Sequence, residues 1–154
     1  MQLLSYIWED FNLEIHFQFM EMDRITLDSV ISMDGFLKGF NIKVKSVEEG
    51  KLDLLVELTP EVMRVGDIMN GGAVMAICDA AGGLVMFSSK GVINEVTINM
   101  STNFLRPIRK GPVLFRSVAS KIGKNIGFSN VDVLDGDGIL CAQANGSWNL
   151  YREG

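Results

Sequence analysis

The segment from Asn70 to Ser88 constrains the fold of this chain more than any other. Small and apolar residues fill it, and Asp79 is the only charged residue between Asp67 and Lys90. Because β-branched residues are sparse here, the pattern predicts one helix of about five turns, with Asn70 as its N-cap. A helix that is apolar on nearly every side must be surrounded by other elements. The rest of the chain is therefore expected to wrap around it.

Strand patterns flank this helix on both sides. Before it, Phe40–Val47 and Leu52–Leu58 alternate polar and apolar residues around a short turn, which predicts an antiparallel hairpin. After it come four further runs of strand type, Val92–Phe104, Val113–Lys121, Ile126–Leu134 and Ile139–Leu150. The segments 109–112, 121–125 and 135–138 between them have the composition of hairpin turns. The sequence predicts an α+β fold, an antiparallel sheet wrapped around one long central helix.

The chain divides into an N-terminal extension, residues 1–35, and a main domain, residues 36–154. Its 154 residues with 47% hydrophobic content suffice for one globular core. In the extension, the alternation at Leu13–Phe19 predicts a strand with His16 on its polar face. A helix is expected around Thr26–Phe36, capped by Thr26 or Asp28.

Composition and charge exclude several classes of function. A net charge of −5 argues against general binding of nucleic acid, and no secretory signal opens the chain. The longest apolar run, 71–87, is too short to span a bilayer comfortably and carries Asp79 at its middle, so we expect no membrane span. Cys78 and Cys141 lie too far apart for a metal knuckle and suit the reducing cytoplasm as buried apolar residues. The single His16, far from Asp79, disfavours Ser-His or Cys-His catalysis and a metal site.

Asp79 and the glycines at the start of the helix are the candidates for chemistry. A buried carboxylate is costly unless it is paired, and on composition alone a structural and a catalytic role are equally supported. Gly71 and Gly72 leave the N–H groups of the helix start open to a carbonyl oxygen, although paired glycines also permit close packing. In one helix Gly71 and Asp79 would lie about 12 Å apart, so a joint site requires two antiparallel helices from two chains.

The order of these motifs resembles the hotdog-fold acyl-CoA thioesterases of the phenylacetate-degradation and 4-hydroxybenzoyl-CoA type. That family has His-Gly-Gly at the start of its central helix, an acid eight residues after the first glycine, and then a strand ending in a sequence like Phe-Leu-Arg-Pro. The matching segments here are Asn70–Gly72, Asp79, Asn103–Pro107, Gly111, Ile122–Asn125 and Asp137–Ala144. The resemblance covers roughly residues 30–150, with Asn70 at the position of the family's histidine.

The resemblance implies a hotdog fold and the hydrolysis of an acyl-CoA to free acid and coenzyme A. Gly71 would polarise the thioester carbonyl, while Asp79 of the partner chain would act as nucleophile or general base. Thr97 matches a position where some relatives carry a serine near the attacking water. The residues expected to bind substrate are Asn70, Gly72, Arg106, Lys124 and Asn125. Coenzyme A enters as part of the substrate, and no metal or other cofactor is expected.

A local excess of basic residues independently favours a phosphate-bearing ligand. The segment Val96–Val131 contains six basic residues and no acid, which leaves eight basic and nineteen acidic residues elsewhere. Such an excess suits the phosphates of coenzyme A. Solvated strand faces and turns would account equally well for any single one of these charges.

Two other functions compete with the thioesterase. A non-catalytic acyl-CoA-binding hotdog protein would keep the pocket, with Asp79 serving only the structure. A hotdog dehydratase or hydratase typically uses a histidine with an acid, which His16 alone does not supply. We expect a cytoplasmic homodimer or homotetramer, and the sequence leaves the acyl group undetermined.

Overall fold

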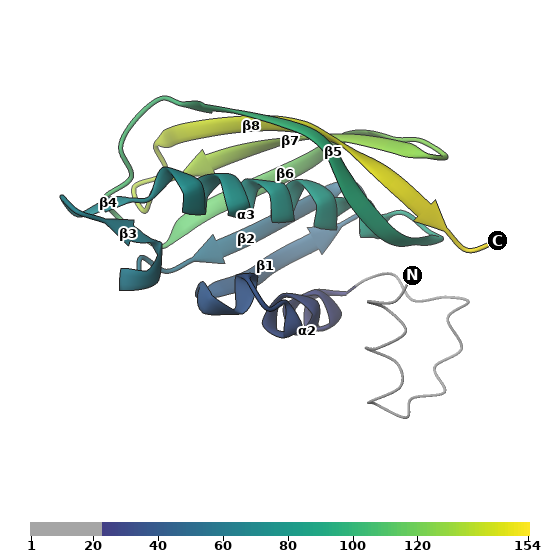
Figure 1. Cartoon of the computed structure of the whole chain (residues 1–154), viewed down its shortest axis with the longest axis horizontal. Helices are drawn as coiled ribbons and strands as arrows, with labels where there is room; N and C mark the ends of the chain where they lie inside the picture. Colours follow the sequence, from purple (N-terminus) through teal and green to yellow (C-terminus); the bar gives the residue numbers. More distant parts are fainter. Residues whose placement is uncertain (1–22) are drawn as a thin grey trace.

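The central helix α3 (Gly71–Leu84) lies along one face of a six-stranded sheet in the computed structural model, which describes residues 23–154 (Figure 1). The strands are β1 (Ile42–Glu48), β2 (Lys51–Val56), β5 (Val92–Phe104), β6 (Val113–Ile122), β7 (Ile126–Leu134) and β8 (Leu140–Arg152). Their spatial order is β1-β2-β6-β7-β8-β5, and every neighbouring pair is antiparallel. The predicted fold, a hotdog fold of α+β class, is confirmed. The strand predicted at Leu13–Phe19, with His16, lies outside the described residues.

Most predicted strands and turns agree with the structure, but the connection between β5 and β6 does not. The predicted hairpin of β1 and β2 is present, and β6, β7 and β8 form a meander joined by two tight turns. However, β5 pairs with β8, while β6 pairs with β2 and β7, so residues 105–112 cross between distant strands. The prediction of a hairpin turn at 109–112 was wrong, because a turn-like composition does not specify which strands pair.

The helices also differ from the prediction in their ends. The predicted long helix is present, but its last turn, η4 (Val85–Ser88), is a 3₁₀ helix that follows α3 directly. The N-terminal helix α2 spans Arg24–Met33, and its cap is Asp23, whose carboxylate accepts a hydrogen bond from the Thr26 N–H at 2.8 Å. The proposed caps Thr26 and Asp28 were therefore wrong. Asp28 instead accepts a hydrogen bond from the Val44 N–H at 2.7 Å, which ties α2 to β1.

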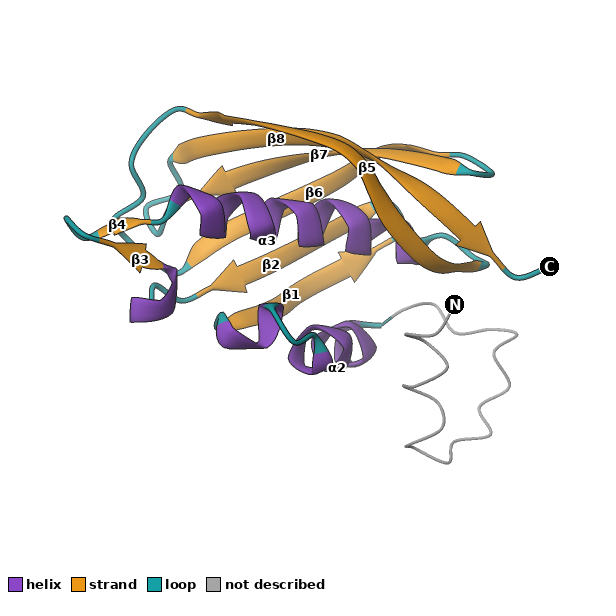
Figure 2. Cartoon of the chain, in the orientation of Figure 1, coloured by secondary structure: helices purple, strands orange, loops and turns teal. Residues whose placement is uncertain are grey.

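Short helical turns and a small second sheet complete the fold (Figure 2). They are the 3₁₀ turns η2 (Leu37–Gly39) and η3 (Pro60–Val62) and a small two-stranded sheet of β3 (Met63–Arg64) and β4 (Ile68–Met69). Leu27 and Ile31 of α2 are buried in the same core as α3 and the sheet. The N-terminal helix therefore packs on the hotdog core rather than standing apart from it.

The central helix is buried because the sheet curves around it. The apolar segment Gly71–Ser88 is long enough to cross a membrane by length and composition, yet 56% of it is buried within the structure. Ala73, Ile77, Ala81 and Leu84 are all buried, and the helix contacts β2, β5, β6, β7 and β8. The core of the domain therefore accounts for the apolar residues on the buried face of the helix, while Met75 on the opposite face is 43% exposed.

Gly82 allows α3 to approach the sheet closely. A Cβ atom at this position would overlap the ring of Trp148, which is fully buried on β8. The carbonyl oxygen of Gly82 accepts a hydrogen bond from the buried Ser129 hydroxyl at 2.9 Å. The absence of a side chain at Gly82 therefore sets the depth at which the helix lies against the strands.

We expect Gly82→Ala to lower the free energy of unfolding by about 1–3 kcal/mol, because the added methyl group overpacks a rigid buried ring. Urea denaturation of the purified protein measures this change. The neighbouring Gly83→Ala is the matched control, since its Cβ would meet only the movable carboxyl end of Glu95. Equal losses for both variants would contradict the role given to Gly82.

Candidate active site

The start of α3 presents an unpaired backbone donor. The side-chain oxygen of Asn70 caps the helix by accepting hydrogen bonds from the N–H groups of Gly72 at 2.7 Å and Ala73 at 3.4 Å. Within residues 23–154, no acceptor pairs with the Gly71 N–H. This N–H carries the partial positive charge of the helix start and is free to donate to a substrate oxygen. A substrate contact by Asn70 or Gly72 stays a prediction.

Asp79 lies two helical turns further along α3 and faces the edge strand. Its carboxylate accepts a hydrogen bond of 2.7 Å from the hydroxyl of Thr97, which lies on β5. Asp79 is half-buried, and Thr97 is exposed. The structure therefore brings together Asp79 and Thr97, two of the three predicted catalytic residues. The carboxylate of Asp79 remains accessible to solvent.

Burial and the charge on Asp79 raise the pKa values of two neighbouring groups, Cys78 and Glu95. Cys78 is fully buried, and burial with that charge raises the pKa of its thiol to about 12, so it is not a thiolate nucleophile. Burial, together with the charge of Asp79, also raises the pKa of Glu95 to about 7. Glu95 lies against Gly83, where a Cβ would come within 2.5 Å of a carboxyl oxygen.

A cleft of about 320 Å³ opens beside Asp79. Residues of α2 and the turn after it form one wall, α3 forms the second, and Asn94 and Glu95 at the start of β5 form the third. Most of the lining side chains are apolar. Mostly apolar clefts with a few polar groups are the usual form of small-molecule sites.

The third predicted catalytic residue, Gly71, does not reach this carboxylate within one chain. Eight residues separate Gly71 from Asp79, which is about 12 Å along the helix axis. Gly71 packs instead beside the ring of Phe104, at 3.5 Å from where its Cβ would be. A site that uses both residues therefore still requires a second chain.

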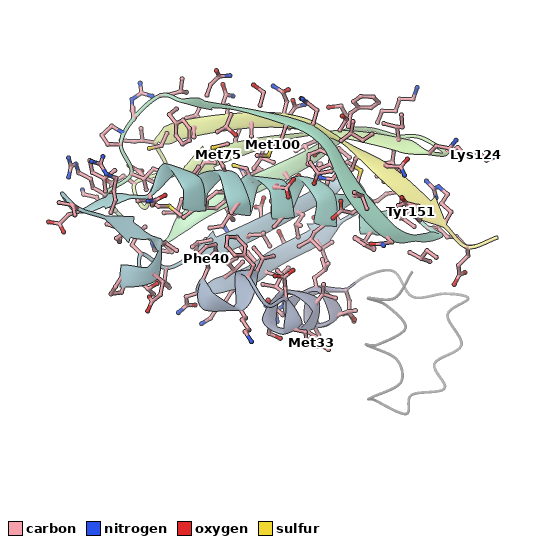
Figure 3. All side chains as sticks on the ribbon, in the orientation of Figure 1. Met33, Phe40, Met75, Met100, Lys124 and Tyr151 are labelled. Atoms are coloured by element: carbon pink, nitrogen blue, oxygen red, sulfur yellow. The ribbon has the colours of Figure 1, made fainter. Side chains whose placement is uncertain are left out.

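The predicted contacts to coenzyme A fall at opposite ends of the sheet. Arg106 follows β5 near the start of α3, and its guanidinium donates to the Leu140 carbonyl at 2.8 Å. Lys124 and Asn125 are exposed in the turn between β6 and β7. Figure 3 shows Lys124 beside Tyr151, at the far end of the molecule from Met75. One chain therefore does not gather these residues around one ligand.

Part of the basic excess is neutralised by acids from other segments. Arg116 makes two hydrogen bonds of 3.1 Å to Asp53 on the adjacent strand β2. Lys110 pairs with Asp137 at 2.7 Å. The acid-free stretch in the sequence is therefore not an acid-free surface in the structure, which weakens the charge argument for a phosphate ligand.

Comparison with known proteins identifies the family. The model of the thioesterase superfamily matches residues 66–142, which include the start of α3, Asp79 and Thr97. A protein of Thermoplasma acidophilum that carries a provisional esterase name is 48% identical over 84% of this chain and 98% of its own length. The chain belongs to the thioesterase superfamily. This membership supports the hydrolysis of thioesters in general.

Solved structures share the fold of this chain at low sequence identity. The PaaI protein of E. coli, from the phenylacetic acid degradation operon, is 20% identical, with a TM-score of 0.72 over 82% of this chain and 90% of its own. The protein smu.793 of Streptococcus mutans, solved with acetyl-CoA bound, is 23% identical, with a TM-score of 0.68 over 73% and 90%. The family match confirms the predicted resemblance to thioesterases, and these two structures show that the fold is shared.

Sequence reasoning missed Glu95 and the wall of the cleft that α2 contributes. A signal for Glu95 was present, because it precedes Thr97 by two residues and therefore shares its face of the strand. The contribution of α2 had no comparable signal. Its contact with the cleft depends on how the helix packs against β1.

The raised pKa of Glu95 makes the stability of this protein depend on pH. The folded protein keeps the proton between the ordinary value of 4.5 and about 7, whereas the unfolded chain loses it. Stability should therefore fall by up to about 3 kcal/mol as pH rises from about 4.5 to 7. Urea denaturation at pH 5 and pH 8 measures this change in the free energy of unfolding. Glu95→Gln should remove this part of the pH dependence, while the exposed Glu48→Gln should keep it.

Proposed function

We propose that the protein hydrolyses acyl-CoA thioesters to free acid and coenzyme A. The observation that carries this proposal is Asp79, a half-buried carboxylate in an otherwise apolar helix, held by Thr97 beside a mostly apolar cleft. A carboxylate with a purely structural role would not need to be accessible from the cleft. Membership of the thioesterase superfamily supports the same reaction class.

The chemistry needs only a carboxylate and a backbone donor. Asp79 either takes a proton from water, whose oxygen attacks the thioester carbonyl carbon, or attacks that carbon itself. The carbonyl oxygen becomes an oxyanion, which the Gly71 N–H stabilises. The carbon–sulfur bond then breaks, and the sulfur of coenzyme A takes up a proton, from Asp79 in the first route and from water in the second. In the second route, water then hydrolyses the mixed anhydride between the acyl group and Asp79, which releases the free acid and restores the carboxylate. No metal or redox cofactor takes part.

One observation supports coenzyme A as the proposed leaving group. The structural relative smu.793 was solved with acetyl-CoA. In this chain Arg106, Lys124 and Asn125 are the proposed contacts to its phosphates and nucleotide. The two free cysteines are both buried, which fits the proposed cytoplasmic location.

We further propose that each site is shared between two chains. Strand β5 is thirteen residues long and lies at the edge of the sheet, with Val96 and Ile98 about half exposed. A long edge strand with exposed apolar side chains favours pairing with another strand. A second copy of β5 across a two-fold axis is the simplest partner, and two such dimers can associate into a tetramer.

The contacts along β5 indicate how this pairing would bring the two catalytic groups together. Thr97 lies against Asp79, while Phe104, seven residues later, lies against Gly71. The irregularity between Thr97 and Asn99 shifts the alternation, so both residues face the helix. If Thr97 pairs opposite the partner's Phe104, the partner's Gly71 approaches Asp79. The two distant catalytic groups then meet twice in each dimer.

Asp79→Asn should lower thioester hydrolysis by about two orders of magnitude or more, because the amide neither accepts a proton nor attacks as a nucleophile. The release of free thiol from a panel of acyl-CoA substrates measures turnover, and light scattering on the same sample checks the oligomer. A folded variant with full activity would remove Asp79 from the mechanism. Acyl-CoA binding without hydrolysis by the wild type would favour the non-catalytic binding protein instead.

Gly71→Pro removes the proposed oxyanion donor with little change to the fold. Proline is well tolerated at the first position of a helix, and Asn70 before it already has the extended backbone that proline requires. We expect hydrolysis to fall by about 10²–10³-fold. Gly71→Ala is the matched control, because it keeps the N–H and its Cβ makes only ordinary contact with Phe104. Equal losses in both variants would indicate a steric effect.

Mixing the two inactive variants tests the shared site. If Asp79→Asn and Gly71→Pro chains are refolded together in equal amounts, half of the dimers are mixed, and each mixed dimer carries one intact site. Activity should then return to about one quarter of the wild-type value. No recovery, with mixed dimers demonstrated by mass spectrometry, would place both groups in one chain.

A further inference from the structure

We propose that the cleft bounded by α2, α3 and β5 holds the acyl group of the thioester and that its carboxyl-bearing wall, centred on Glu95, restricts the enzyme to uncharged acyl groups of medium size. This inference rests on the proposed function. It names the class of substrate, which neither the family match nor the relatives specify.

The position of the cleft suits an acyl group. Asp79 lines its opening, so a thioester carbonyl held beside this carboxylate directs its acyl chain into the cleft. Asn94 and Glu95 precede the part of β5 that is proposed to pair with a partner, so this wall of the cleft lies outside the paired segment. A hollow of about 450 Å³ lined by Lys38, Thr59 and Glu61 lacks Asp79, and we assign it no role.

The lining of the cleft sets its size. Ala76, Ala80 and Leu84 follow one another at intervals of four residues and therefore share one face of the helix. The two alanines leave space that larger side chains would fill. A cavity of about 150 Å³ binds benzene in another protein. The cleft, at about 320 Å³, therefore has room for an aromatic ring with a short side chain, or an aliphatic chain of similar volume.

The charges around the cleft select against an acyl group that ends in a carboxylate. Asp79 from α3, Asp34 from the end of α2 and Glu95 from β5 all line it, and none of its described lining residues is basic. Asp34 is held in place by hydrogen bonds from the N–H groups of Phe36 and Leu37, at 2.9 and 2.8 Å. A substrate carboxylate would lose water there without gaining a cation. An uncharged acyl group meets no such penalty.

Of the three acids that line the cleft, Glu95 is the best placed to repel an acyl group that ends in a carboxylate. Its carboxyl group lies over Gly83, one helical turn beyond Asp79, on the wall of the cleft. Its pKa of about 7 means that the group is charged at pH 8 and largely neutral at pH 6. Repulsion of an acidic acyl group should therefore be stronger at the higher pH.

The first test compares pentanoyl-CoA with glutaryl-CoA, which have acyl chains of equal length and differ by the terminal carboxylate. At pH 8 we expect wild-type kcat/KM for pentanoyl-CoA to exceed that for glutaryl-CoA by at least about tenfold. Glu95→Gln should narrow this ratio several-fold, mainly through KM for glutaryl-CoA. Glu48→Gln, an equivalent change at an exposed acid, should leave the ratio unchanged. Equal rates for both substrates in the wild type would overturn the proposal.

The second test changes the size of the cleft. Ala80→Leu, and separately Ala76→Leu, should lower kcat/KM for octanoyl-CoA by about tenfold more than for acetyl-CoA, whose acyl group barely enters the cleft. Melting temperatures confirm that the variants fold. Equal losses for both substrates in two folded variants would show that the acyl group binds elsewhere.

The outcomes separate this inference from the proposed function. If the wild type hydrolyses none of these thioesters, the proposed function fails, and calorimetry with the same substrates and variants still tests the cleft. Weaker binding of glutaryl-CoA than of pentanoyl-CoA, reduced by Glu95→Gln, would support it. Equal binding of both would overturn it.

Discussion

The structure depends on the burial of one apolar helix that carries a single charge. Burial of α3 against five strands supplies most of the core, but it also brings the Asp79 carboxylate into an apolar neighbourhood, where an unpaired charge is costly. This cost is reduced because Asp79 faces the edge strand β5. There its carboxylate accepts a hydrogen bond from the Thr97 hydroxyl. The candidate active site therefore lies where the core reaches solvent.

The edge strand β5 connects the remaining parts of the proposed mechanism. It contacts Asp79 through Thr97, Gly71 through Phe104 and Gly83 through Glu95, so three positions along the helix are each matched by a residue of this strand. Its outer edge has no partner within the described chain. The same strand can thus position the carboxylate, form one wall of the acyl cleft and join two chains, which explains why the proposed chemistry and the proposed dimer are inseparable.

Glycine has different roles along α3. At Gly82 it permits close contact with Trp148, which fixes the helix against the sheet, while at Gly83 it leaves space for a carboxyl group beside the cleft. Gly71 keeps the helix start accessible beside Phe104. The glycines give α3 a low intrinsic helix propensity, but they also let it pack closely against its neighbours. The stability of the helix therefore comes from the sheet around it.

The sequence by itself determined the main helices and strands and the family, because these depend on local patterns. The apolar run around Asp79 predicted a surrounded helix, the alternation predicted the strands, and the order of Asn70–Gly72, Asp79 and Asn103–Pro107 predicted the family that the comparison confirms. Only the tertiary structure decided that β5 pairs with β8, that α2 forms a wall of the cleft, and that Arg116 and Lys110 are paired with acids. Strand order, cleft walls and ion pairs join residues that are distant in the chain, and local patterns carry no information about such contacts.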